Sequence, residues 1–159
     1  MDAAEIMLRE YCQTDLATMF MLDEVCFASE FRFDRESMRA FAGARNAIVL
    51  IAEQAGRAMA GFVIAHVERT SAGRRGYVVT LDVAPECRRM RIGERLMRDV
   101  ERRVFAEGAL WMELHVFTGN DGAIRFYERL GYARVAMQQR FYGADGLDAL
   151  VYRRELTAL

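Results

Sequence analysis

The chain has 159 residues, of which 53% are hydrophobic and 11% aromatic, enough to fill one core in a single domain covering residues 1–159. Its 22 basic and 23 acidic residues nearly cancel, so overall charge would not recruit nucleic acid or an anionic membrane. Every basic residue is arginine, which excludes mechanisms that need a Schiff-base lysine or a P-loop lysine.

The cysteines and the N-terminus indicate the cellular compartment in which the protein is expected. Cys12, Cys26 and Cys87 are odd in number and widely spaced, so they predict neither a disulfide framework nor a zinc site, and we expect no metal. The N-terminus is acidic and lacks the apolar core of a signal peptide, and the longest apolar run, residues 47–52, is too short to span a bilayer. We expect a cytoplasmic protein that is not embedded in a membrane, as a monomer or weak homodimer.

The first half of the chain is expected to be rich in strands. Residues 5–11 predict a strand, and Thr14 is the expected N-cap of a following helix. The inner side of that helix carries Leu16, Met19, Phe20 and Val25. A short helix is expected over residues 35–42. Three apolar strands, separated by a hairpin turn at EQAGRA and a flexible loop at RTSAGRRG, are predicted over residues 47–53, 58–67 and 76–83.

The second half alternates between strands and helices. Apolar residues recur every fourth position from Ile92 to Val104 and stop before Gly108, which predicts an amphipathic helix of about four turns. A later helix is capped by Asn120 and ends with Gly131 in the left-handed position. Strands are predicted over residues 110–117, 132–141 and 148–154. This order predicts an α/β domain with a mixed sheet, helices on both faces and one parallel strand pair.

The segment CRRMRIGERLM, residues 87–97, lies at a strand-to-helix junction. The N–H groups of a first helical turn have no internal partner and lie at the positive end of the helix dipole, so they suit a phosphate. Gly93 allows close approach, and Arg88, Arg89 and Arg91 add positive charge that an anion would offset. The alternative is a solvated, arginine-rich helix end. The glycine patterns of P-loop nucleotide hydrolases and of Rossmann dinucleotide sites are absent.

Residues 83–97, VAPECRRMRIGERLM, resemble the pyrophosphate loop Q/R-x-x-G-x-G/A of the GNAT acetyltransferases. Arg88 and Gly93 fill its first and last positions, and Arg91 replaces the usual central glycine. The resemblance implies the GNAT fold, a mixed and mostly antiparallel sheet of about seven strands with a splayed central parallel pair. It also implies acetyl-CoA as co-substrate. The cofactor-binding residues that it implies are Leu81, Val83, Arg88, Arg89, Met90, Arg91, Ile92, Gly93, Glu94, Asn120, Ala123 and Tyr127.

Two further segments carry candidate acid and base groups. In LWMELHVFTGN, alternation along a strand puts Glu113 and His115 on one face, about 7 Å apart, as two possible bases. On the next helix Asn120 and Tyr127 lie seven positions apart, so an amide and a phenol could line one channel. Taken alone, a histidine such as His115 is more often an ordinary hydrogen-bonded residue than a base, and a tyrosine such as Tyr127 is more often a half-buried core residue.

Residues 114–132, LHVFTGNDGAIRFYERLGY, are similar without gaps to a segment of GNATs that acetylate protein N-termini, including the bacterial ribosomal-protein-alanine acetyltransferases of the RimI family. RimI relatives commonly have glutamate at the position of His115, whereas several archaeal and eukaryotic N-terminal acetyltransferases have histidine. Tyr77 falls where some of these carry a second catalytic tyrosine. By the same resemblance, the residues that flank the peptide entrance are Phe27, Phe31, Tyr142 and Asp148.

These features predict transfer of an acetyl group to a primary amine, most simply the N-terminal α-amine of a protein such as a ribosomal protein. An α-amine has a pKa of about 7.7–8.0, against about 10.4 for lysine, so a histidine with a pKa near 6.5 is a sufficient base. We expect His115 to be that base, with Tyr77 orienting a water or sharing the role and Glu113 as the fallback. Tyr127 is the expected acid for the leaving thiolate, and Asn120 is expected to hold the pantetheine arm.

Other functions remain open at this point. GNATs share a donor site and differ at their acceptor loops, so the acceptor could be a small amine such as a polyamine or an antibiotic. A regulatory module that binds coenzyme A without turnover would keep the same loop. Nucleic-acid binding through the arginine patch is disfavoured by the near-zero net charge and by the absence of a recognition motif.

Overall fold

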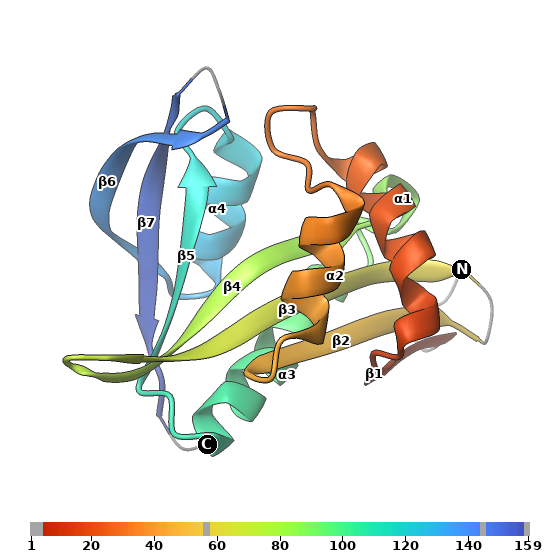
Figure 1. The fold of residues 1–159 in the computed structure, drawn as a ribbon, viewed down its shortest axis with the longest axis horizontal. Helices are drawn as coiled ribbons and strands as arrows, with labels where there is room; N and C mark the ends of the chain where they lie inside the picture. Colours follow the sequence, from red (N-terminus) through yellow and green to blue (C-terminus); the bar gives the residue numbers. More distant parts are fainter. Residues whose placement is uncertain (1–4, 56–57, 144–145, 158–159) are drawn as a thin grey trace.

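The computed structural model describes residues 5–55, 58–143 and 146–157 (Figure 1). These residues form one seven-stranded sheet in the order β1-β2-β3-β4-β5-β7-β6. The strands are β1 (Ile6–Glu10), β2 (Ala47–Gln54), β3 (Met59–Thr70), β4 (Gly73–Val83), β5 (Trp111–Phe117), β6 (Ala133–Tyr142) and β7 (Leu147–Glu155). The helices are α1 (Leu16–Cys26), α2 (Arg35–Gly43), α3 (Ile92–Ala106) and α4 (Asp121–Arg129). Neighbouring strands are antiparallel except β4 and β5, so the predicted mixed sheet with one parallel pair is confirmed.

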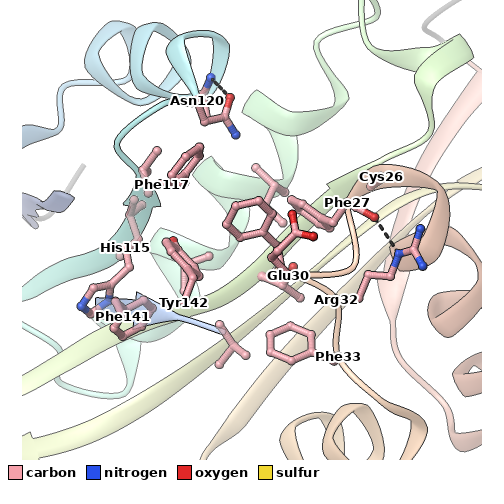
Figure 2. A pocket seen from close by; sticks show the side chains of 18 of the residues that line it. Cys26, Phe27, Glu30, Arg32, Phe33, His115, Phe117, Asn120, Phe141 and Tyr142 are labelled. Atoms are coloured by element: carbon pink, nitrogen blue, oxygen red, sulfur yellow. Dashed lines mark hydrogen bonds between the residues drawn. The ribbon is translucent and has the colours of Figure 1, made fainter. Parts of the chain in front are cut away.

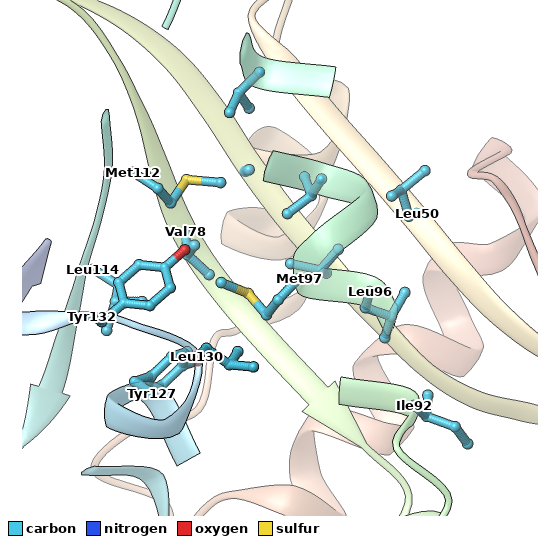
Figure 3. Packing of buried hydrophobic residues seen from close by; sticks show 14 of the residues in the cluster. Leu50, Val78, Ile92, Leu96, Met97, Met112, Leu114, Tyr127, Leu130 and Tyr132 are labelled. Atoms are coloured by element: carbon cyan, nitrogen blue, oxygen red, sulfur yellow. The ribbon is translucent and has the colours of Figure 1, made fainter. Parts of the chain in front are cut away.

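The helices cover both faces of the sheet, with α1 and α2 on one side and α3 and α4 on the other (Figure 1). The apolar stripe predicted from Ile92 to Val104 is buried against β2, β3 and β4. Figure 3 shows Met97 of α3 near Leu130, which follows α4, in the same apolar layer. Within the described ranges, no helix combines the length and the apolar character needed to cross a membrane.

The start of α1 differs from the sequence-based prediction. A short 3₁₀ helix, η2 (Gln13–Asp15), precedes α1, and Asp15 makes the capping contacts. Its carboxylate accepts the N–H of Cys12 at 2.8 Å and pairs with Arg9 at 2.8 Å. The prediction of Thr14 as N-cap was wrong because the neighbouring carboxylate satisfies this turn and is itself held by a guanidinium from β1.

The inner side of α1 also differs, because it carries a carboxylate. Val25 is 64% exposed, so its predicted inward position was wrong. Asp23 is fully buried instead; its carboxylate accepts the N–H of Phe33 at 3.0 Å and lies close to the carboxyl group of Asp82 of β4. Burial, with the nearby Asp23, raises the pKa of Asp82 well above its usual range. Two carboxyl groups this close in a dry site share a proton more readily than they both ionise.

β3 and β4 are longer than predicted. β3 continues to Thr70 and β4 begins at Gly73, which pair across a tight turn in which Gly73 has φ of 121°. The prediction of a flexible loop over residues 69–76 was therefore wrong. The local glycine and arginine content of this segment does not indicate a strand. The backbone hydrogen bonds between β3 and β4 nevertheless hold it in a strand. This extension places Arg75 beside β5.

Candidate active site

The parallel pair β4–β5 opens into a cavity. The strands pair only where Arg75, Gly76 and Tyr77 face Trp111, Met112 and Glu113, and they diverge beyond this point although both continue. A cavity of about 780 Å³ occupies the divergence (Figure 2). Its lining includes the loop between α1 and α2 on one face of the sheet and residues of α4 on the other. The cavity therefore connects the two faces of the sheet.

Nine of the 19 predicted site residues meet at this cavity. Those that line it are Phe27, Phe31, Tyr77, Leu81, His115, Asn120, Ala123, Tyr127 and Tyr142. Among the described residues, those predicted for the site that do not line it are Val83, residues 88–94, Glu113 and Asp148. The described part of the chain contains no group of three or more acidic, histidine or cysteine side chains placed to hold a metal ion.

His115 of β5 lies at the centre of a hydrogen-bonded chain. The Tyr77 hydroxyl is hydrogen-bonded to Nδ1 of His115 at 2.7 Å, and Nε2 of His115 is hydrogen-bonded to Oε1 of Gln138 at 2.9 Å. Burial lowers the pKa of His115, and the hydrogen bond to Gln138 opposes this shift in part. The imidazole is therefore neutral at neutral pH and can accept a proton.

An irregularity in β6 completes the surroundings of His115. The ring of Phe141 stacks on the imidazole, with centroids 3.9 Å apart and an interplanar angle of 3°. The pairing of β6 with β7 is irregular after Gln138, where Arg140 has φ of 55° and its N–H donates to Asp148 Oδ1 at 3.0 Å. No sequence pattern indicated Gln138 or Phe141, because Gln138 lies 23 residues from His115 and a contact made across a sheet leaves no local pattern.

Glu113, the fallback base, is held outside the cavity. Its carboxylate forms an ion pair with Arg75 and accepts a hydrogen bond from Trp111 Nε1 at 3.3 Å. Arg75 also pairs with Glu68 at 2.9 Å. These contacts occur where β4 and β5 are still paired, so Glu113 would have to leave them to reach a substrate in the cavity.

Tyr127 and Asn120 bring α4 to the cavity. Tyr127 is 8% exposed, and burial raises the pKa of its phenol well above the ordinary value, so the hydroxyl stays protonated at neutral pH. The Asn120 Oδ1 atom accepts the N–H of Ala123 at 3.1 Å. This bond caps α4 as predicted and fixes the orientation of the Asn120 amide at the cavity wall (Figure 2).

The predicted pyrophosphate loop joins β4 to α3. Arg95 N–H donates to the Arg91 carbonyl at 3.1 Å, so the N–H groups of residues 92–94 lie in the first turn, before any intrahelical partner. Arg91 has φ of 59°, so an arginine adopts a left-handed conformation that normally favours glycine. A Cβ on Gly93 would lie 3.2 Å from the ring of Phe126, and the glycine therefore lets α3 and α4 approach closely.

The arginines of this loop lie beside the start of α3. Arg88, Arg89 and Arg91 are exposed. Arg88 Nε donates to the carbonyl of Val83 at 3.3 Å, and the thiol of Cys26 donates to the same carbonyl at 3.3 Å. Free amides and mobile guanidinium groups at one helix N-terminus form a site suited to an anion.

Aromatic rings form the opposite side of the cavity. Phe31, between α1 and α2, lies 5.1 Å from Phe117 and 4.9 Å from Tyr142, measured between ring centroids. Phe27 lines the same side (Figure 2). Three of the four predicted acceptor residues thus come together, whereas Asp148 holds the irregular part of β6 that precedes Tyr142.

The sequence of residues 15–132 matches the acetyltransferase (GNAT) family. The chain belongs to this family. It is 32% identical over 103 residues to the N-terminal acetyltransferase B complex catalytic subunit NAA20 of Arabidopsis thaliana, covering 62% of this chain and 58% of that protein. It is 37% identical over 78 residues to the N-alpha-acetyltransferase RimI of Mycobacterium tuberculosis, covering 49% and 48%. The chain thus spans about half the length of the curated relatives it matches.

Solved structures of low sequence identity share this fold. Ard1 from Thermoplasma volcanium superposes with a TM-score of 0.85 at 22% identity, over 97% of this chain and 99% of that chain. NAA60 of Arabidopsis thaliana, crystallised with acetyl-CoA, gives a TM-score of 0.82 at 21% identity, over 96% and 99%. The predicted family and GNAT fold are confirmed. GNAT acetyltransferases take their acetyl group from acetyl-CoA.

Proposed function

We propose that this protein transfers the acetyl group of acetyl-CoA to the N-terminal α-amine of a protein. The observation that carries the proposal is the His115–Tyr77 pair inside a cavity that connects the two faces of the sheet. A donor arriving along α4 and an acceptor arriving past the α1–α2 loop would meet beside this pair. The names of the relatives NAA20 and RimI support an α-amine as the acceptor.

The donor site would be the start of α3 together with α4. The N–H groups of residues 92–94 would bind the diphosphate, and the exposed Arg88, Arg89 and Arg91 would add charge–charge attraction. Asn120 and Ala123 line the cavity beyond this site, where the pantetheine arm would run. These groups would bring the thioester to the divergence of β4 and β5.

The proton steps would use two groups on opposite sides of the cavity. An α-ammonium with a pKa of about 7.7–8.0 is within reach of a neutral imidazole, and burial keeps His115 neutral. Glu113 is the weaker candidate for this base, because its carboxylate forms an ion pair with Arg75. After attack on the thioester, the protonated phenol of Tyr127 would donate to the departing thiolate, and the proton that the attacking nitrogen loses on becoming an amide would restore the phenol.

A coupled thiol-release assay tests the proposed function. Acetyl-CoA would be offered with peptides that begin with Ala, Ser, Met or Gly, with polyamines and with aminoglycosides. We expect turnover of at least one peptide, and no turnover of the same peptide with a blocked N-terminus. Faster turnover of a polyamine or aminoglycoside than of every peptide would refute the α-amine as acceptor. Coenzyme A binding without turnover of any amine would refute the enzymatic function.

A further inference from the structure

We infer that Gln138 is a positioning residue that holds His115 in its Nε2–H tautomer, so that Nδ1 accepts the proton of Tyr77 and the Tyr77 oxygen meets the acceptor amine. The inference rests on the proposed function and deepens it, because it assigns the order in which the groups act. It also gives a role to Gln138 of the edge strand β6, a residue that no sequence pattern pointed out.

The geometry fixes the direction of each hydrogen bond. An amide oxygen only accepts, so Oε1 of Gln138, 2.9 Å from Nε2, requires a proton on that nitrogen. A neutral imidazole then has its lone pair on Nδ1, where the Tyr77 hydroxyl lies 2.7 Å away and must donate. Phe141 stacks at 3.9 Å on one face of the ring and limits its rotation. The orientation of His115 is therefore set by contacts from β4 and β6 together.

In this arrangement Tyr77 is the member of the hydrogen-bonded series that can contact the acceptor amine. Both ring nitrogens of His115 are engaged, whereas the Tyr77 oxygen still has lone pairs and its side chain lines the cavity. The acceptor ammonium would give its proton to the Tyr77 oxygen as the phenolic proton moves to Nδ1. The products of this step are a neutral amine and an imidazolium whose Nε2–H still donates to Gln138. After acetyl transfer, the proton returns by the same route to solvent.

The charged groups around His115 balance one another. Glu113 of β5 favours the imidazolium, and Arg75 of β4 opposes it; these two side chains are paired with each other. Tyr77 of β4 is neutral at neutral pH because burial raises its pKa to about 12. Gln138 of β6 makes the hydrogen bond to Nε2 of His115. Replacing its side chain therefore tests the arrangement directly.

Nuclear magnetic resonance of the free protein provides a test that needs no turnover. The chain has 2 histidines, so ¹⁵N-histidine spectra of wild type and of His66→Asn assign both rings. We expect the Nε2–H tautomer for His115, retained in Gln138→Glu with the pKa raised by about one unit or more. We expect a mixture of tautomers in Gln138→Leu. A dominant Nδ1–H tautomer of His115 in the wild type would overturn the inference. So would variants in which the tautomer and the pKa of His115 are both the same as in the wild type.

The pH profile of peptide acetylation gives the second readout. The acid limb of kcat/KM should move upward in Gln138→Glu by the same amount as the pKa of His115. Gln138→Leu should lower kcat in proportion to the fraction of His115 that the spectra of this variant show in the Nδ1–H tautomer. Gln139→Glu and Gln139→Leu make the same changes at the next, exposed residue and should change neither quantity. An unshifted acid limb in Gln138→Glu would contradict the inference, whereas an inactive wild type with the expected spectra would contradict only the proposed function.

Discussion

Replacing Asp82 with asparagine should increase the free energy of unfolding at neutral pH. Asp23 is 0% exposed and Asp82 1% exposed, and each has one carboxyl oxygen without a hydrogen-bond partner among the described residues. An asparagine amide at position 82 would donate permanently to Asp23 and would still accept the Thr80 hydroxyl, which now donates to Asp82 Oδ1 at 2.6 Å. The substitution replaces a shared proton with a fixed donor.

The sign and size follow from proton linkage. The pKa of Asp82 is raised in the folded protein, whereas in the unfolded chain an aspartate has a pKa of about 3.9. Above this value the folded state holds a proton that the unfolded state has lost, so stability falls as pH rises. The loss is about 1.4 kcal/mol per pH unit until the folded pKa is passed. Asp82→Asn should remove this pH-dependent loss. The difference in free energy of unfolding between the variant and the wild type should therefore grow by about 1.4 kcal/mol for each pH unit.

Urea unfolding followed by circular dichroism from pH 4 to pH 8 measures both proteins. Near pH 4 the two free energies of unfolding should differ least, because Asp82 is protonated in the folded protein and only about half ionised in the unfolded chain. At pH 8 the variant should be the more stable. The exposed neighbour of Asp23 gives a matched control, Glu24→Gln, which should leave the slope unchanged. If the stability difference between Asp82→Asn and the wild type is no larger at pH 8 than at pH 4, the shared-proton reasoning is wrong.

Three further predictions concern the donor side. Tyr127→Phe should lower kcat by roughly 10²–10⁴-fold if its proton limits the rate, and an unchanged kcat in the thiol-release assay would remove it from that role. Arg91→Gly should be about 1 kcal/mol more stable than Arg91→Ala, because only glycine adopts the left-handed conformation freely; thermal unfolding giving the opposite order would contradict the positive φ. Gly93→Ala brings a Cβ within 3.2 Å of the Phe126 ring, so its effect on stability should be about 1 kcal/mol more favourable in a Phe126→Leu background than in the wild type, as a double-mutant cycle measures.

The sequence by itself determined the features that depend on local pattern. The four-residue period of α3, the alternation along β5 and the caps of α4 gave the elements and their inner faces, because one helix or strand buries one side wherever it lies. The pyrophosphate-loop pattern gave the family, since phosphate binding at a helix start needs specific residues at fixed spacing. His115, Tyr127 and Tyr77 were named as candidates by resemblance to a known family, and the structure places all three around one cavity.

The tertiary structure alone decided which side chains meet. Gln138 reaches His115 from β6, Asp23 meets Asp82 from α1, and Arg75 pairs with Glu113 because β4 runs beside β5 for a few residues before diverging. Each contact depends on strand register or helix docking across the sheet, and residues far apart in the chain carry no local signal of such pairing. Local propensity therefore set the framework of the site, and long-range packing set the ionisation states within it.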